Sequence, residues 1–243
     1  MKMRVFAGRT AKEILRDPLN LIFGLGFPVV LILLMSAIQR SVPVPLFEIQ
    51  TLTPGIMVFG LSFLTLFSAT LVARDRETAF LQRLYTTPLK GTDFIFGYAL
   101  PILPMALGQG VICFALAMLL GLEWSVNILW SLIVLLPIAI FNIALGILCG
   151  SVLKVKQVGG LCGALLTNLT AWLSGAWFDL SLVGGAFKKI ADLLPFVHAV
   201  DAERAILAGS TEGLATHMIW VCAYALIFLA LAIFMFLRQM KNQ

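Results

Sequence analysis

Charged residues are scarce in this sequence. Only 12% of its 243 residues are Asp, Glu, Lys or Arg, whereas 60% are hydrophobic and the mean hydropathy is +1.01. Soluble globular domains carry about 25% charged residues, so the composition excludes that class and predicts an all-α integral membrane protein. About six or seven helices of roughly 20 residues fit into this length. We therefore expect one transmembrane domain over residues 1–243, with no soluble domain beside it.

The sequence also lacks the motifs of nucleotide binding and of intramembrane catalysis. It contains no G-x-x-x-x-G-K-[ST] segment and no Gly-Lys dipeptide, so it cannot hold nucleotide phosphates in a P-loop. No His-x-x-x-His, Gly-x-Ser-x-Gly or Gly-x-Gly-Asp grouping lies in or beside an apolar run, which leaves an enzyme that acts on lipids without support. We predict no catalytic residue and no cofactor in this chain.

Metal-binding residues are few and poorly spaced. The four cysteines have no C-x-x-C spacing and lie inside apolar runs, so we interpret them as small packing residues; they are Cys113, Cys149, Cys162 and Cys222. His198 lies near Asp201, Glu203 and Arg204. One histidine beside two acids at mixed spacing is more often a satisfied surface cluster than a metal site, and we predict no metal.

Six apolar runs are long enough to cross about 30 Å of hydrocarbon. They lie near residues 19–38, 54–73, 101–120, 128–150, 159–178 and 214–237. With six spans, thirteen Lys and Arg residues fall on the side of the termini and four on the other. Basic residues near span ends are retained in the cytoplasm, so we predict a multi-pass protein of the plasma membrane with both termini cytoplasmic.

Residues 1–18 have the pattern of a helix that lies in the membrane interface. Apolar residues gather on one side and basic residues on the other: Met3, Phe6, Ala7 and Ile14 against Arg9, Lys12 and Arg16. We expect this helix to contact lipid headgroups. The alternative is an irregular basic tail that only sets the topology. The apolar run that follows is too long for a signal-peptide core and has no clear cleavage site, so we expect no cleaved signal.

A charged stretch, residues 72–90, separates the second and third spans. Residues 75–85 fit a short amphipathic helix, with Phe80, Leu81, Leu84 and Tyr85 on one side and Asp75, Arg76, Gln82 and Arg83 on the other. Glu77 falls on the apolar side, where an unpaired carboxylate is expensive to desolvate, so it either faces water or has a partner. Pro88 ends the helix. The alternative is a solvated loop that only sets topology.

The segment between the fifth and sixth spans, residues 179–213, is too long for a turn. It is too interrupted by Gly184, Gly185 and Pro195 to cross the bilayer. Two short re-entrant or outer-surface helices fit, at about residues 183–194 and 197–207.

Uncharged polar residues inside the spans mark helix contacts or a translocation path. Our path candidates are Ser62, Thr65, Gln109, Asn142, Thr167, Asn168 and Trp172. For Gln109 and Asn142 an interhelical hydrogen bond is an equal alternative, and Trp172 fits a gate, an interface belt or plain packing. No ionisable residue lies at mid-depth, which disfavours an ion-coupled carrier. The Gly pairs 146/150 and 159/163 permit close helix approach.

The charged stretch resembles a segment of a known family, the membrane subunits of ABC-2 type exporters. In that family a cytoplasmic Arg-Glu-x-Gly-Thr-x-Glu-x-Leu-x-x-Thr-Pro-Leu segment follows the second span, and here Arg76, Glu77, Leu84, Thr87, Pro88 and Leu89 match it. Ala79, Phe80 and Gln82 depart from it. A basic-Asp-Pro turn at Arg16-Asp17-Pro18 and a late helix from Leu194-Pro195 to Arg204 are also similar, although the family's Asn before that proline is missing.

The resemblance implies a permease subunit that exports an amphiphilic substrate: a drug, an antibiotic peptide or a lipid. It implies a coupling helix that docks on a separate cytosolic ABC ATPase, which binds Mg-ATP, and a second permease copy or paralogue that faces the first, second and fifth spans. The implied coupling residues are Arg74, Asp75, Arg76, Glu77, Leu81, Leu84, Thr87 and Pro88. No nucleic-acid partner is expected. The alternative is a free-standing secondary transporter or channel, which would need no ATPase.

Overall fold

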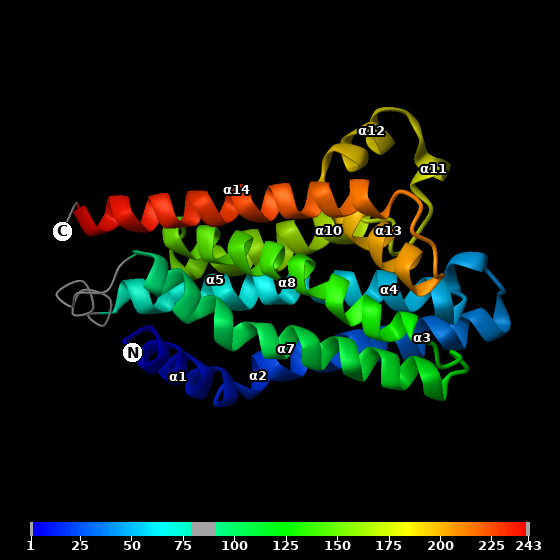
Figure 1. Ribbon diagram of the computed structural model, residues 1–243, viewed down its shortest axis with the longest axis horizontal. Coiled ribbons are helices and arrows are strands. Elements are labelled where there is room, and N and C mark those ends of the chain that lie inside the picture. The colour runs from blue at the N-terminus through cyan, green and yellow to red at the C-terminus, as the bar shows by residue number, and fades with distance from the viewer. Residues whose placement is uncertain (1, 79–90, 242–243) are drawn as a thin grey trace.

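The computed structural model describes residues 2–78 and 91–241, and all regular secondary structure within them is helical. The long helices lie side by side and form one elongated bundle (Figure 1), which confirms the all-α fold class. In chain order the elements are α1 Lys2–Leu15, α2 Pro18–Leu21, η1 Ile22–Gly26, α3 Phe27–Ser41, η2 Pro45–Phe47, α4 Ile49–Gly60, α5 Ser62–Glu77, α7 Gly91–Leu119, α8 Asn127–Val152, α9 Val155–Val158, η3 Gly159–Leu166, α10 Thr167–Leu173, α11 Leu180–Val183, α12 Gly185–Leu193, α13 Pro195–Leu207 and α14 Leu214–Lys241.

Five helical stretches in the described residues are long and apolar enough to cross a membrane, and they correspond to five of the six predicted spans. They are Ile22–Ser41, Ile49–Glu77, Gly91–Leu119, Asn127–Val152 and Leu214–Arg238. Two of them begin earlier than predicted, because Pro54 lies inside α4, and Pro101 and Pro104 lie inside α7. Proline is tolerated inside membrane helices when neighbours satisfy the freed backbone groups.

The predicted fifth span, residues 159–178, is not one of these five stretches. The chain is helical without a break from Val155 to Leu173 through α9, η3 and α10, in which η3 is π-helical. This helical stretch ends five residues before the predicted boundary. Gly175 follows with φ +69°, a left-handed conformation that no helix contains and that glycine adopts without strain.

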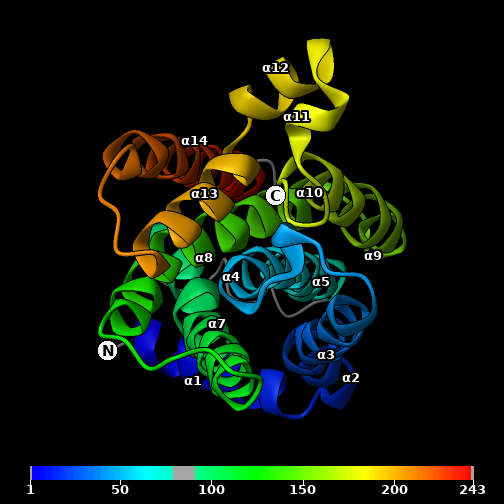
Figure 2. The ribbon, with the colours of Figure 1, turned by 90° about the vertical axis from the view of Figure 1, so that its right-hand side faces the viewer.

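Both ends of the chain lie at the same end of the bundle. Figure 1 shows the start of α1, the end of α14 and the end of α5 together at the left, which we name the terminal end. The short helices α11, α12 and α13 lie toward the opposite end, which we name the far end. Figure 2 looks onto the far end and shows α4 and α5 at the centre of the bundle, with α11 and α12 standing away from it.

Helix α1 forms as predicted, but its apolar side meets protein. Phe6 is buried against α7, in edge-on contact with Phe94 and Tyr98 at centroid distances of 5.8 and 4.9 Å. Gly97 of α7 makes room for the Phe6 ring, because a Cβ there would collide with it. Phe6 and Ile14 of the predicted apolar side are therefore covered by protein, and contact of α1 with lipid headgroups stays a prediction. The sequence pattern shows that the side is buried but not what covers it.

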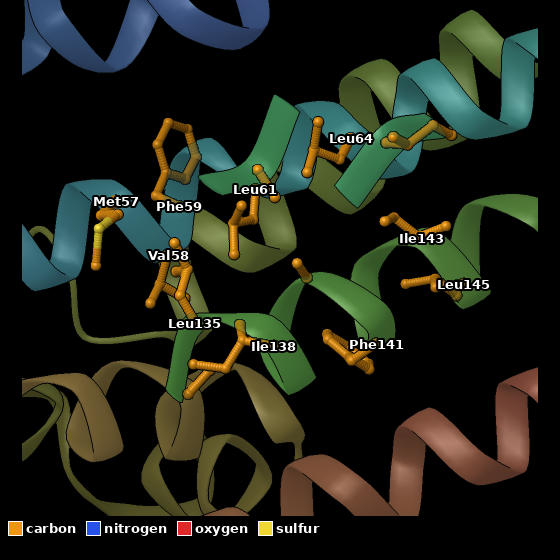
Figure 3. Packing of buried hydrophobic residues seen from close by; sticks show 14 of the residues in the cluster. Met57, Val58, Phe59, Leu61, Leu64, Leu135, Ile138, Phe141, Ile143 and Leu145 are labelled. Carbon is orange, nitrogen blue, oxygen red and sulfur yellow. The ribbon is translucent and has the colours of Figure 1, made fainter. Parts of the chain in front are cut away.

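The core lies where α4 and α5 pack against α8, and Figure 3 shows this contact. Leu61 and Leu64 belong to the same buried cluster as Ile138 and Phe141 of α8. Phe141 itself contacts Phe196 of α13 and Phe228 of α14. Gly146 and Gly150 of α8 allow close approach, since a Cβ on either would collide with the α5 backbone. This confirms one of the two predicted glycine pairs as a helix contact. A Cβ on Gly159, in the other pair, would meet nothing within 4 Å.

Candidate functional site at the end of the second span

Four consecutive charged residues form the last turn of α5, at the terminal end. The helix runs unbroken to Glu77, and the backbone becomes extended at Thr78, with φ −95° and ψ 157°. The prediction of a separate helix that begins at Asp75 is therefore wrong for its first three residues. Leu81, Leu84, Thr87 and Pro88, the other half of the predicted coupling segment, lie outside the described residues. We name Arg74, Asp75, Arg76 and Glu77 the α5 junction.

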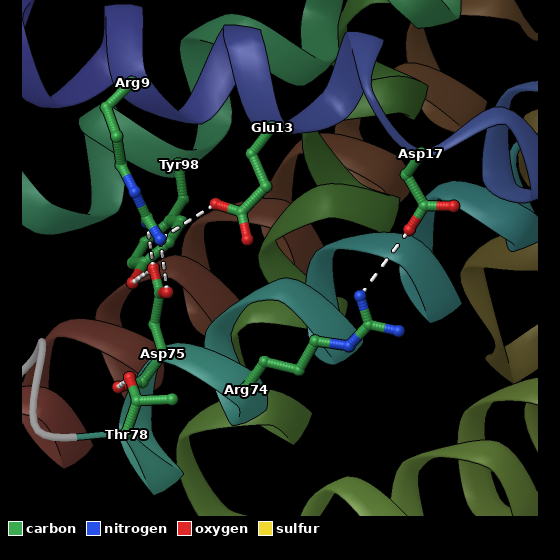
Figure 4. A network of polar contacts seen from close by, with 7 residues as sticks. All are labelled: Arg9, Glu13, Asp17, Arg74, Asp75, Thr78 and Tyr98. Carbon is green, nitrogen blue, oxygen red and sulfur yellow. Dashed lines mark hydrogen bonds and ion pairs between the residues drawn. The ribbon is translucent and has the colours of Figure 1, made fainter.

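Asp75 is the buried member of the α5 junction, at 3% exposure. Arg9 of α1 donates to both of its carboxylate oxygens, at 2.5 and 2.8 Å, and the Tyr98 hydroxyl of α7 donates at 2.8 Å (Figure 4). A bidentate arginine and a third donor are what a buried carboxylate needs to offset its desolvation. The sequence pattern placed Asp75 on the polar side of a short helix, whereas the structure buries it at the end of α5.

The C-terminal half of α1 and the turn that follows it make two further charged contacts near Asp75. Arg9 also pairs with Glu13 at 2.9 Å, one turn along α1. Burial raises the pKa of Glu13, and the neighbouring Arg9 charge opposes that rise. Arg74 lies 3.6 Å from Asp17 at the turn between α1 and α2 (Figure 4), and this pair is partly exposed. Exposed pairs contribute little stability, so Asp75 is the main tie between α1 and α5.

The next two residues of the junction contact the ends of α8 and α9. Arg76 donates to the carbonyl oxygens of the last α8 residues and of the connection after it, including Leu153 at 2.6 Å. The C-terminus of a helix attracts cations because its carbonyls are unsatisfied. Glu77 accepts from the backbone N–H of Val155, the first residue of α9, at 2.9 Å. Glu77 is exposed and also has a partner, so both predicted alternatives for it are met.

The α5 junction thus joins one helix end to four other elements. Arg74 and Asp75 contact the α1 region, Asp75 also contacts α7, Arg76 contacts α8, and Glu77 contacts α9. Sequence reasoning found these four residues but missed their partners Arg9 and Tyr98. A buried aspartate at a span end requires a cation, yet several basic residues were available and the sequence does not say which one folds back.

Four of the seven path candidates are buried inside the chain, and three of them make contacts between helices. The Thr65 hydroxyl donates to the Asn142 backbone oxygen at 3.0 Å, which ties α5 to α8. The Gln109 amide donates to the Met57 carbonyl at 2.9 Å, which ties α7 to α4. Ser62 is also buried. For Gln109 and Asn142 the structure shows the interhelical contacts named as the alternative to a lining role.

The other three candidates lie on the stretch formed by η3 and α10. The buried Thr167 hydroxyl donates to the Cys162 carbonyl at 3.0 Å. Asn168 is exposed, and Trp172 is 58% exposed. Asn168 and Trp172 share their outward face with apolar residues at helical spacing, which are Leu161, Leu165 and Leu169. This face is uncovered in the single chain.

At the far end, α12 and α13 correspond to the two predicted short helices. Glu203 of α13 is fully buried and accepts a hydrogen bond from Ser131 of α8, so its place in a surface cluster is corrected. Arg204 donates to the carbonyls of Thr51 and Gly175, at 3.2 and 3.0 Å. Burial raises the pKa of Glu203 to about 8. Among the described residues, no group of three or more His, Cys, Asp or Glu could hold a metal ion.

The fold and the junction together define a helical membrane protein in which the ion pairs of the described residues gather at one end of the bundle. The chain belongs to the ABC-2 type transporter family, whose model matches residues 1–208, from α1 through α13. This confirms the resemblance drawn from the charged stretch. The chain is accordingly the multi-pass transport subunit of an ABC transporter, and the family implies an ABC ATPase as its partner. No curated protein matches the chain.

Proposed function

We propose that the chain is the permease subunit of an ATP-driven exporter, and that the α5 junction carries the movement of its ATPase partner into the bundle. The observation that supports this is the place of the junction. Its last two residues, Arg76 and Glu77, begin the segment that resembles the family's docking motif, and it holds α1, α7, α8 and α9 at one point. Mg-ATP binds to the partner, and this chain supplies no catalytic group.

The packing of α5 suits it to transmit a displacement. Thr65 and Ser68 approach α8 at Gly146, so the two helices cannot separate or slide without breaking close contacts. A push at Glu77 then moves α5 and α8 as one rigid body, and packed interfaces of this kind shift between discrete arrangements. The α5 junction is the end of that body on which the ATPase partner acts.

We further propose six membrane passes, with the terminal end in the cytoplasm. Five passes alone would leave the two chain ends on opposite sides, whereas Figure 1 places them at one end. The stretch from Val155 to Leu173 supplies the sixth pass, since α9 contacts the end of α5 and α10 packs against α4 and α13. At about 1.5 Å per residue it reaches about 28 Å. The excess of Lys and Arg at the terminal end supports the orientation.

The proposed working unit is a pair of permeases, identical or paralogous. Two apolar faces flank the central helix α5 in Figure 2: that of α3, with Val30 and Leu34, and that of η3 and α10, with Leu165 and Trp172. A second copy would cover both and enclose a path for an amphiphilic drug, peptide or lipid. Because Ser62, Thr65, Gln109 and Asn142 are buried within one chain, the path we propose runs along Asn168 and Trp172 instead.

The test is reconstitution with and without an ABC ATPase expressed from the same genome. The tagged chain is purified with its ATPase, placed in liposomes with fluorescent amphiphiles, and assayed for ATP-dependent transport. We expect transport only with the ATPase and ATP. Arg76→Ala should reduce transport per ATP hydrolysed, whereas Arg40→Ala, an exposed arginine at the far end of α3, should not. Transport by the chain alone would overturn the proposal in favour of a channel or secondary carrier.

A further inference from the structure

The only two histidines of the chain face each other at the far end. Nδ1 of His198, on α13, lies 2.9 Å from Nδ1 of His217, on α14. Nε2 of His198 lies 2.9 Å from the carbonyl oxygen of Asp192, on α12. These contacts join three elements that are separate in the chain, and neither histidine has a part in the function proposed above.

The two contacts fix where the protons lie on a neutral pair. A carbonyl oxygen only accepts hydrogen bonds, so Nε2 of His198 carries the proton that points to Asp192. Neutral His198 then has a bare Nδ1, which accepts, and His217 donates from its own Nδ1. One extra proton can enter on the bare Nε2 of His217 without disturbing this bond. A second would place two N–H groups and two positive charges face to face.

A row of aromatic residues on α14 extends the same contact. Trp220 stacks on the His198 ring at 5.1 Å with an interplanar angle of 19°. Tyr224 stacks on Trp220, and its hydroxyl donates to the Leu193 carbonyl at 2.9 Å. His217, Trp220 and Tyr224 are spaced three and four residues apart, so they share one face of α14. That face holds the connection between α12 and α13.

The charged surroundings of the pair are sparse. Asp192 on α12 and Asp201 on α13 are the acids that act on His198. The other elements that pack on α13 are α4, α8 and α10, and they contain no charged residue. Burial and the facing His217 lower the pKa of His198, and the Asp192 carbonyl and the two acids oppose this. The second proton therefore enters only in acid.

We propose that His198 and His217 form a proton-dependent clasp, which fastens α13 to α14 while the pair holds at most one extra proton and releases when a second binds. A far-end cavity of about 670 Å³ is lined in part by the helices that the clasp fastens, with Asp192 of α12 and Val197 and Asp201 of α13 among its lining residues. Release frees α13 on the α14 side, and with it this part of the cavity wall. That the far end faces the outer medium, so that acid outside the cell acts on the clasp, rests on the proposed topology. The existence of the clasp does not rest on it.

Histidine-selective NMR tests the proton arrangement directly, because a ¹⁵N-histidine label gives signals from only two residues. The full chain in lipid nanodiscs is titrated from pH 8 to pH 4.5. We expect at pH 8 a protonated Nε2 on His198 and a protonated Nδ1 on His217, then two separate titration steps, the second below the ordinary histidine value of about 6.5. His217→Gln should abolish the split. Two independent ordinary titrations would overturn the clasp.

Hydrogen exchange tests the release. The chain is labelled with deuterium at pH 7.5 or at pH 5, the exchange is corrected for its intrinsic dependence on pH, and peptides from α12 and α13 are compared. Loss of one ordinary hydrogen bond predicts about two- to tenfold more opening at pH 5. Tyr224→Phe, the matched control, removes a bond of the same contact but no titrating group, and should keep the acid response. His198→Gln and His217→Gln should lose it. Equal responses in all four proteins, or none in the wild type, would overturn the proposal.

Discussion

Asp75 shows how much depends on one side chain of the α5 junction. Replacing it with Asn keeps its size but removes the charge that both Arg9 hydrogen bonds use. We expect Asp75→Asn to lower stability by about 1.5–3 kcal/mol, the range for hydrogen bonds to charged groups. Thermal unfolding in detergent measures this. Tyr98→Phe, which removes one donor, should have a smaller effect.

Exchanging the two charges tests whether Arg9 and Asp75 stabilise the protein through their contact with each other. The double variant Arg9→Asp, Asp75→Arg should recover part of the stability that each single variant loses, because contacting residues couple energetically. If the double variant is as unstable as the sum of the singles, the Arg9–Asp75 bond is not what holds α1 to α5.

We expect the folding stability of the chain to depend on pH because of the buried side chain of Glu203. Its pKa is raised by burial to about 8 from an ordinary value of 4.5, so between these values the folded chain binds more protons than the unfolded chain. Stability from this group is then fully present below about pH 4.5 and falls as pH rises toward about 8. Glu203→Gln keeps an acceptor for Ser131 but does not titrate. Melting temperatures from pH 5.5 to pH 9 should fall more in the wild type than in the variant, and parallel curves would contradict this.

At the scale of the helices, Gly146 and Gly159 form a matched pair of sites. A Cβ at Gly146 meets the backbone of α5, whereas at Gly159 it meets open space. We expect Gly146→Ala to destabilise the bundle by about 1–3 kcal/mol through overpacking. Gly159→Ala should be neutral or should stabilise by up to about 1 kcal/mol, because alanine favours helix. Thermal unfolding of both variants decides it, and equal effects would refute the close approach of α5 and α8.

The helices were predictable to the extent that hydrophobicity alone decides them. Apolar runs located five spans, and glycine and proline located α12 and α13. The end of α5 was not predictable, because a helix continues through charged residues when distant partners pair with them. Arg9 and Tyr98 lie 66 and 23 positions from Asp75. The same limit applies to α1: its pattern marks a buried face, but lipid and α7 bury it equally well.

For the whole molecule, the proposed pair of permeases predicts which faces touch a second copy. In a chain whose four cysteines are replaced by alanine, Trp172→Cys introduces a thiol on the exposed face of α10, and Ile227→Cys introduces one on the exposed face of α14. Both faces are apolar, so hydrophobicity does not distinguish them. Their positions do: Figure 2 places α10 beside the central helix α5, and α14 at another side of the bundle, toward α13.

Copper phenanthroline in native membranes should link two copies of the Trp172→Cys variant and leave the Ile227→Cys variant monomeric. Dilution of the protein in nanodiscs to one chain each should abolish the link. A dimer linked through residue 227 instead would place α14 at the interface and lipid against α10, and the path along Asn168 and Trp172 would then be excluded.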